Sequence, residues 1–374
     1  MLVAAGSQAA DFGDVQIGGF VSQGYLQTNK NNYLADSKRG SFEFNEMGIN
    51  FQTFPAENVM IGLQLTARDL GDVGEDEVGI GWAFGEYRWR DWLGTRAGVL
   101  KVPYGLYNET RDYDFLRPYI LLPSGIYNEW LRDMTDNMKG MQLFGNVEMG
   151  KAGLLGYAFQ GGSVQVGLDS GTALFIKELN PSVSSLDDVE PLHAYVANIN
   201  WFAPVDGLRL GITSTYIPEL VNHTTLANGA SMTTTSTDLV TMLYSVEYIF
   251  RDLVLAGEYS TIQRDEERHI PALAMLTKSK FKGGPQYYVS ASYRFTEWFQ
   301  LGTYYSMYES DKDVDAKTNE LEDICLSLRF DINESWIVKG EAHVMDGLFG
   351  VFPEDDGTLD DSWMLYAVKL SYSF

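Results

Sequence analysis

The feature that most constrains the fold is a two-residue alternation of side-chain character in many short segments of the chain. In 362–374, every second residue from Met364 to Phe374 is apolar, and the residues between them include Lys369 and Ser371. Because successive side chains of a β-strand point to opposite faces, this pattern predicts a strand with unlike faces. The same period recurs in several other segments, which predicts an all-β protein: 59–68, 240–250, 287–295 and 322–330.

The segments that join the predicted strands are of two kinds, and the two kinds alternate. Short joints carry aromatic and acidic residues, as in 89–94, 295–298 and 331–336. Short turns at one end and long loops at the other are typical of outer-membrane β-barrels, in which aromatic residues gather at the membrane interfaces. We expect the longer polar or charged joints at 165–191, 224–237, 265–283, 309–321 and 346–361.

These patterns predict a transmembrane antiparallel β-barrel of about 16 strands, an even number that places both termini on the short-turn side. We expect the first ten residues to be a residual signal peptide and 11–374 to be a single barrel domain; a disordered polar N-terminus is the alternative for 1–10. The predicted strands begin near residues 15, 41, 59, 78, 95, 140, 154, 193, 208, 237, 253, 284, 299, 320, 336 and 362.

Composition excludes several other classes of protein. No run of eighteen apolar residues is present, which excludes a transmembrane helix. A formal net charge of −24 argues against a nucleic-acid partner, which requires clustered basic residues. The single cysteine, Cys325, excludes an intramolecular disulfide and a cysteine-based zinc cluster.

One long segment, from Val102 to Gly140, interrupts the alternation. It is far longer than the two to six residues of an ordinary connection. It carries apolar residues such as Phe115 and Trp130, which need a surface to pack against. We therefore predict that this segment folds into the mouth of the barrel and narrows it. By the strand count it is the third long loop.

The whole chain resembles the Gram-negative porins in its length, its sixteen amphipathic strands and its long third loop. The pattern from Val368 to Phe374 resembles the aromatic C-terminal signal of outer-membrane barrels, and 101–112 is similar to porin-like proteins. The Pro-Glu-Phe-Gly motif of general porins is absent, and the loop carries Leu-Leu-Pro-Ser-Gly at 121–125 instead. A substrate-preferring porin therefore stays open. The resemblance implies outer-membrane lipid, the barrel-assembly machinery that reads Phe374 and a homotrimer as partners, and no cofactor.

Charged residues of the third loop and of the inner wall are the candidate pore-lining residues. Opposed charges across a constriction set up a transverse field that selects ions and polar solutes. The alternative is that these charges form neutralised pairs or are solvated near the openings. The loop acids favour cations, whereas wall arginines at the narrowest point would favour anions. The candidates are Asp112, Asp114, Arg117, Glu129 and Asp133 of the loop, and Arg68, Arg209, Arg294, Arg329 and Lys369 of the wall.

Two features of the sequence could indicate other chemistry. Residues 311–322 have the spacing of a calcium loop except that Ala316 replaces the turn glycine, and a solvated acidic hairpin is the alternative, so no metal ligand is assigned. The histidines are scattered and no nucleophile elbow accompanies them, so no catalytic residue is assigned and an enzyme is not expected. His343 lies on the same strand face as Glu341 and is interpreted as a pore-wall residue.

The sequence therefore predicts an outer-membrane porin that passes small hydrophilic solutes and ions by passive diffusion through a charged constriction. Two alternatives remain. One is a structural or adhesive barrel that the third loop plugs, and the other is a barrel hydrolase.

Overall fold

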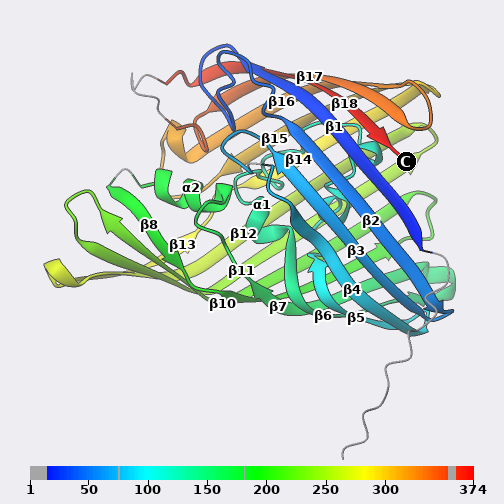
Figure 1. Cartoon of the computed structure of the whole chain (residues 1–374), viewed down its shortest axis with the longest axis horizontal. Coiled ribbons are helices and arrows are strands. Elements are labelled where there is room, and N and C mark those ends of the chain that lie inside the picture. The colour runs from blue at the N-terminus through cyan, green and yellow to red at the C-terminus, as the bar shows by residue number, and fades with distance from the viewer. Residues whose placement is uncertain (1–14, 75, 181, 353–358) are drawn as a thin grey trace, which may run out of the picture.

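The computed structural model describes residues 15–352, apart from 75 and 181, and residues 359–374. The predicted signal peptide at 1–10 lies outside the described residues. All strands belong to one antiparallel sheet, and the final strand pairs with the first, so the sheet closes on itself (Figure 1). Phe374 and Gly19 exchange two backbone hydrogen bonds of 3.1 Å at this seam. The prediction of a closed all-β barrel is confirmed.

The sheet contains eighteen strands, of which sixteen form the ring of the barrel. The other two, β8 and β13, pair with the ends of β10 and β12. The strands are β1 (Gln16–Thr28), β2 (Asn45–Ala56), β3 (Val59–Asp69), β4 (Gly79–Arg90), β5 (Leu93–Lys101), β6 (Asn137–Glu148), β7 (Leu154–Val164), β8 (Val183–Val189), β9 (Leu192–Phe202), β10 (Leu208–Leu226), β11 (Ser231–Phe250), β12 (Leu253–Ile270), β13 (Met275–Lys282), β14 (Gln286–Thr296), β15 (Phe299–Glu309), β16 (Glu320–Asp331), β17 (Trp336–Gly347) and β18 (Ser362–Ser373).

Helices occur only as short elements among the described residues. None of them is long and apolar enough to span a membrane. The α-helices are α1 (Arg132–Thr135) and α2 (Gly171–Glu178), and the 3-10 helices are Asn108–Thr110, Asp114–Leu116, Gly150–Ala152, Pro271–Leu273 and Lys317–Asn319.

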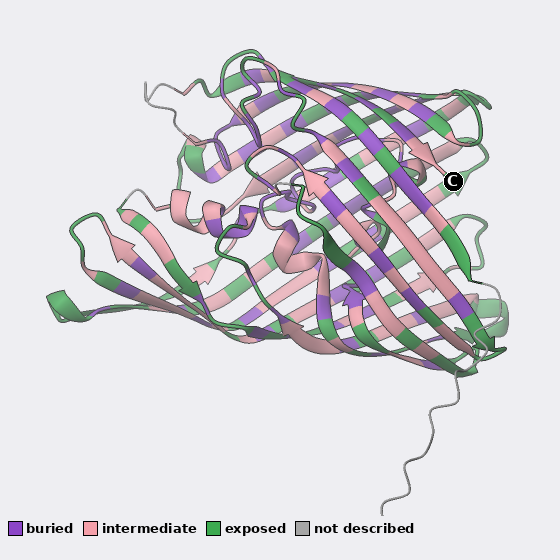
Figure 2. Cartoon of the chain, viewed as in Figure 1, coloured by how far each residue is buried: buried purple, intermediate pink, exposed green. Residues whose placement is uncertain are grey.

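The two faces of the wall differ as the alternation predicts. On β16, Asp323 and Arg329 are buried, whereas Ile324 and Leu326 are about half exposed at 51% and 49%. Figure 2 shows the same alternation of buried and exposed residues along many strands. Apolar side chains thus cover the outside of the ring and polar ones most of its inside, which is the arrangement of barrels that cross a membrane.

Short turns and long connections alternate as predicted except between β9 and β12, where all three connections are short, and two of the predicted long joints are wrong. Residues 224–237 and 265–283 are mostly strand, because β10 ends only at Leu226, β11 already begins at Ser231 and β12 ends only at Ile270. The threonine-rich stretch at 231–237 suits an extended backbone. These parts are polar on both faces, so they lack the period that identifies a strand with one apolar face.

The long connections contribute a shared apolar core, which we call the loop cluster. It brings together one or more buried residues from each of five connections between strands. Its members on α2 and on the third loop stack, with the ring centroids of Phe175 and Trp130 6.3 Å apart. Burial of these side chains holds the connections together as one layer at that end of the barrel. The defining residues are Leu34, Val73, Trp130, Phe175 and Phe349.

Candidate functional site

The segment between β5 and β6, residues 102–136, is held against the wall by buried cationic side chains. Nζ of Lys339 on β17 donates to the carbonyl oxygens of Asp114 at 2.6 Å and Tyr119 at 3.2 Å. Arg329 on β16 donates to two further carbonyl oxygens of the segment, at 2.7 Å and 3.1 Å. An irregular backbone can lie away from water only when its polar groups have such partners.

A wall carboxylate fixes the next part of the segment. Glu341 on β17 accepts hydrogen bonds from the backbone N–H groups of Ile120, at 2.7 Å, and Leu121, at 3.0 Å. The hydroxyl of Ser306 on β15 accepts one from the N–H of Gly125 at 2.8 Å. A Cβ atom at Gly125 would lie 2.5 Å from a backbone carbonyl oxygen of β15, so this close approach requires glycine.

Residues near both ends of the segment meet a second wall carboxylate, Glu258 on β12. Its carboxylate accepts hydrogen bonds from the N–H of Leu106 at 3.0 Å and from the hydroxyl groups of Tyr127 and Tyr288. Since β14, β15 and β16 separate β12 from β17 in the ring, the segment is held between distant parts of the wall. Figure 1 shows α1 among the strands in agreement with these contacts.

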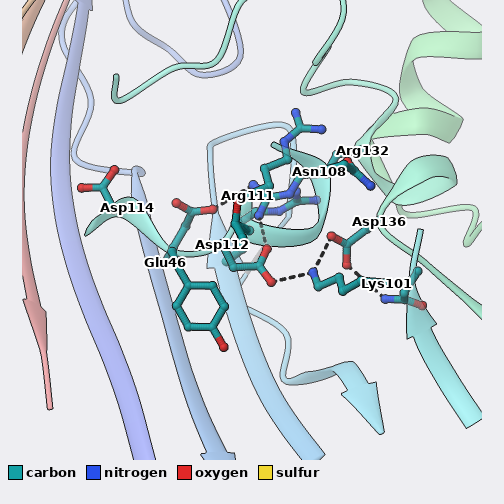
Figure 3. Close-up of polar contacts among 12 residues, drawn as sticks. Glu46, Lys101, Asn108, Arg111, Asp112, Asp114, Arg132 and Asp136 are labelled. Atoms are coloured by element: carbon teal, nitrogen blue, oxygen red, sulfur yellow. Dashed lines mark hydrogen bonds and ion pairs between the residues drawn. The ribbon is translucent and has the colours of Figure 1, made fainter. Parts of the chain in front are cut away.

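A network of buried charges surrounds Asp112 (Figure 3). Nζ of Lys101, at the end of β5, lies 2.5 Å from Asp112 and 2.6 Å from Asp136. Arg132 of α1 lies 2.7 Å from the other carboxylate oxygen of Asp112 and 2.8 Å from Glu46 on β2. Each charge in this chain of contacts has neighbours of opposite sign, which is the condition under which buried charges are tolerated.

Further ion pairs extend the network to β3 and β18 and along the segment. One of them joins the wall to the third loop, one joins two strands of the wall and one lies within the loop, so the segment cannot leave the wall without separating at least one pair of opposite charges. They are Lys369–Glu46 at 2.6 Å, Arg111–Glu129 at 2.7 Å and Arg68–Asp133 at 2.9 Å.

Asp112 and Glu129 of the segment are ionised because of these cations. Burial alone would raise the pKa of Asp112, but Lys101 and Arg132 outweigh burial and lower this pKa to about 2. Burial opposes ionisation of Glu129 in the same way, and the charges of Arg111 and Arg132 lower its pKa to about 2. At neutral pH both groups therefore carry a negative charge.

A polar cavity of 320 Å³ lies beside the network, against β2, β3 and β4. Six acidic and two basic side chains line it, so its charge is predominantly negative. These are Glu46, Glu77, Asp112, Asp133, Asp136 and Asp169, with Arg68 and Arg132.

An apolar cavity of 170 Å³ lies on the opposite side of the segment. It is bounded by the start of β6 and by the inner faces of β9, β10 and β11. The inner wall is therefore polar beside β2–β4 and apolar beside β9–β11. Its apolar lining includes Val102, Leu131, Met138, Val196, Ile217 and Leu239.

Most of the predicted pore-lining residues meet, but as two groups of paired charges. Asp112, Glu129 and Asp133 join the charge network with wall residues Arg68 and Lys369. The structure thus describes neutralised pairs at these positions, and their role in lining a pore stays a prediction. The second group is Asp114, Arg117 and Arg329, all of which lie close to Lys339.

Two predicted wall residues lie apart from both groups, near short turns. Arg209 begins β10 and donates to Asn200 at 2.9 Å. Arg294 ends β14 and lies 2.7 Å from Asp331. Neither forms an ion pair with a carboxylate of the third loop among the described contacts, so the expected opposition of loop acids and wall arginines does not extend to them.

Four cations that organise the site are not among the candidates predicted from the sequence. Lys101 and Lys339 lie on the inner faces of β5 and β17, whereas Arg111 and Arg132 belong to the third loop. Alternation placed Lys339 inside the barrel, but it does not say which loop residue a wall side chain meets. The sequence feature that could have identified Lys101 is its position at the end of β5, where the wall continues into the third loop.

The candidate calcium loop at 311–322 is organised by an asparagine side chain. Nδ2 of Asn319 donates to the carbonyl oxygens of Asp311 and Val314, and its Oδ1 accepts from the N–H of Asp311 at 2.9 Å. The amide group of Asn319 therefore supplies the contacts that close this loop. Calcium binding there remains untested.

No protein-family model and no curated protein matches the chain. Solved structures do. OmpT, expressed in the outer membrane of Vibrio cholerae, matches with a TM-score of 0.56 at 11% identity, over 98% of this chain and 99% of that one. OmpF of Salmonella typhi, in complex with daunomycin, matches with a TM-score of 0.56 at 14% identity, over 96% of this chain and 97% of that one.

The chain has the fold of the porins. The outer-membrane channel DcaP of Acinetobacter baumannii belongs to the same set of neighbours, with a TM-score of 0.55 at 12% identity over 96% of this chain and 97% of that one. The resemblance to a porin-like barrel is thereby confirmed. At these identities the likeness concerns the fold, and the site of this porin-like barrel must be interpreted from its own residues.

Proposed function

We propose that the porin-like barrel is an outer-membrane channel for passive diffusion of small hydrophilic solutes and ions, with cations preferred. The observation that carries this proposal is the polar cavity between the third loop and β2–β4, in which acidic side chains outnumber basic ones six to two. A negatively charged passage raises the local concentration of cations and lowers that of anions. The charges of the loop and wall pair closely with each other, so Glu77 and Asp169, at the edge of this cavity, have the leading role in selection.

Single-channel recording in a planar bilayer with a salt gradient tests this proposal. We expect stepwise openings and a reversal potential of the sign that cation selectivity gives. A reversal potential of the opposite sign would contradict the proposed filter, and openings of either sign would support the channel. Control recordings with heat-unfolded protein should show no openings.

A plugged structural or adhesive barrel is the second candidate, and the loop cluster favours it. The third loop forms hydrogen bonds with β12 and β14–β18, and the loop cluster packs it against other long connections. Correctly folded protein that shows no openings in the bilayer would support this candidate. The barrel hydrolase has no comparable support, and we propose that the chain is not an enzyme.

We further propose a homotrimer in the bacterial outer membrane, with Phe374 recognised by the barrel-assembly machinery. One of the matching structures of the Vibrio cholerae OmpT is described as a trimer form. The outward-facing apolar residues of the ring supply the surface that lipid and neighbouring copies would cover. Sedimentation of the folded protein in detergent, corrected for bound detergent, measures the assembly.

A further inference from the structure

Three potential metal ligands converge on the inner wall where β16 and β17 pair. Cys325, Glu341 and His343 each offer a ligand atom, and these atoms lie within 4.8 Å of one another. All three side chains are buried, and Cys325 and His343 are directly opposite each other in the strand register. This is the only such group of three that the described part of the chain contains.

The orientation of the histidine ring is already fixed by a neighbouring carboxylate. Nδ1 of His343 lies 3.0 Å from Oδ1 of Asp323, and the hydroxyl of Tyr304 donates to Oδ2 of the same carboxylate at 2.9 Å. Metal-binding histidines usually donate their second ring N–H to a carboxylate in this way. The other ring nitrogen, Nε2, is thereby left facing Glu341.

The spacing of His343 and Glu341 suits two ligands of one ion better than a hydrogen-bonded ion pair. Nε2 of His343 lies 3.4 Å from Oε2 of Glu341. A hydrogen bond between imidazolium and carboxylate is usually about 2.7–2.9 Å. Two ligand atoms at about 2.0–2.1 Å from a tetrahedral zinc ion are about 3.3 Å apart.

Glu341 has the capacity to bind a metal in addition to the loop. Each of its oxygens accepts one backbone N–H, from Ile120 and from Leu121. A carboxylate has about four acceptor positions, so two remain. A cavity of 20 Å³ lined by His343 and Asp323 lies next to the ring and has room for one water molecule.

We propose that Cys325, Glu341 and His343 bind one divalent transition-metal ion of the zinc type. A thiolate, an imidazole and a carboxylate are the donors that such ions take in proteins. Binding forms the metal–sulfur bond and releases the thiol proton to solvent. The two positive charges of the ion offset the thiolate and the carboxylate of Glu341, and the carboxylate of Asp323 stays hydrogen-bonded to His343 and Tyr304. Because Glu341 holds the third loop, the site connects metal binding to the position of that loop, whether or not the barrel conducts.

Cobalt(II) is the probe, added to the folded full-length chain in detergent. We expect one equivalent to bind, with a thiolate-to-cobalt charge-transfer band in the near ultraviolet and the visible bands of tetrahedral cobalt. Zinc(II) should displace it. The variant Cys325→Ser should lose the charge-transfer band and bind at least about tenfold more weakly. His269→Gln, on the exposed end of β12, is the matched control and should bind as the unmodified protein does.

An absent charge-transfer band in the unmodified protein would overturn the proposal. So would an unchanged spectrum in Cys325→Ser, because the metal would then bind elsewhere. Electrophoretic mobility before and after heating verifies that each variant is folded. If the serine variant does not fold, Cys325→Ala removes the thiol without adding a buried polar group, and the same loss of the band is expected.

Discussion

Lys339 and Asp114 form a buried ion pair across 225 positions of sequence, with Nζ of the lysine 3.0 Å from Oδ1 of the aspartate. The lysine side chain is 0% exposed and the aspartate side chain 3% exposed. The hydroxyl of Ser371 on β18 donates to the other oxygen of Asp114 at 2.7 Å. The third loop is therefore attached to the two strands that complete the ring.

Removal of the lysine from this pair should destabilise the barrel strongly. Lys339→Met leaves the charge of Asp114 buried without its closest cation, and such a loss typically lowers the free energy of unfolding by about 3–5 kcal/mol. Urea unfolding in detergent, followed by tryptophan fluorescence, measures the change. Lys151→Met, at an exposed position in a short turn, is the control and should change stability by less than about 0.5 kcal/mol. A loss no larger than that of the control would show that the pair contributes little.

Acid should loosen the third loop before it unfolds the wall. Burial raises the pKa of Asp114, but Lys339, Lys369 and Arg117 outweigh it and lower this pKa to about 2, as neighbouring cations do for Asp112 and Glu129. The ordinary values are 3.8 for aspartate and 4.5 for glutamate. Because the folded pKa values are depressed, these groups stabilise the fold fully above about pH 4.5 and lose that effect as pH falls toward 2.

The pH dependence has its own measurement and control. Unfolding free energies collected from neutral pH down to about 2 should decline across that window, with a slope that reports the protons taken up on unfolding. Asp112→Asn removes one of the three groups and should make the decline shallower. An unchanged slope in this variant would mean that Asp112 is not among the groups that titrate.

Ion selection should depend on the acidic residues at the edge of the polar cavity. The double variant Glu77→Gln/Asp169→Asn should reduce the cation-to-anion permeability ratio by about twofold for each charge, as expected for a unit charge about 8 Å from an ion in water at an ionic strength of about 0.1 M, where salt screens the interaction. The reversal potential in a salt gradient measures the ratio. Asp187→Asn/Glu267→Gln removes two charges from β8 and β12 outside this cavity and should leave the ratio unchanged. Equal effects of the two double variants would indicate that overall charge selects the ion.

The loop cluster should make a large contribution to stability through Trp130. This side chain is 1% exposed and lies edge to face with Phe352, with ring centroids 5.1 Å apart. Trp130→Ala should lower the free energy of unfolding by about 3–5 kcal/mol and increase the fluctuations of the channel current. Trp298→Ala, which removes a 56% exposed ring from the outer face, is the matched control and should cost less. If the current of Trp130→Ala fluctuates no more than that of the unmodified protein, the loop cluster does not control the fluctuations of the pore.

The wall could be predicted from sequence because the alternation within each strand indicates which side chains face the inside of the barrel and which face the outside. The alternation in 362–374 identifies β18 and both of its faces, and the predicted starts at 59, 154, 208, 253, 299, 320, 336 and 362 coincide with the observed ones. The start of β6 differs, at Asn137 instead of residue 140, because the end of the third loop has no period that marks the boundary.

The site could be predicted only in part, because pairing across the interior is set by the path of an irregular loop. Alternation assigned Arg68 and Lys369 to the inner face, and the loop acids were evident from composition. Nothing local in the sequence indicates that Arg132 contacts both Asp112 and Glu46, which lie 20 and 86 positions away. Such contacts form only because the loop folds back against the wall, and no local sequence pattern indicates the path that the loop takes.

The extended strands β10, β11 and β12 have a consequence for how the protein resists proteolysis. They contain 19, 20 and 18 residues, whereas about 9–11 residues suffice to cross a bilayer. A protease cleaves a flexible segment that can enter its active-site cleft. A hairpin held by cross-strand hydrogen bonds is not such a segment. The part of the wall that stands beyond the lipid is therefore protected from digestion by its own strand pairing, at residues where a flexible loop of the same polar composition would be cut.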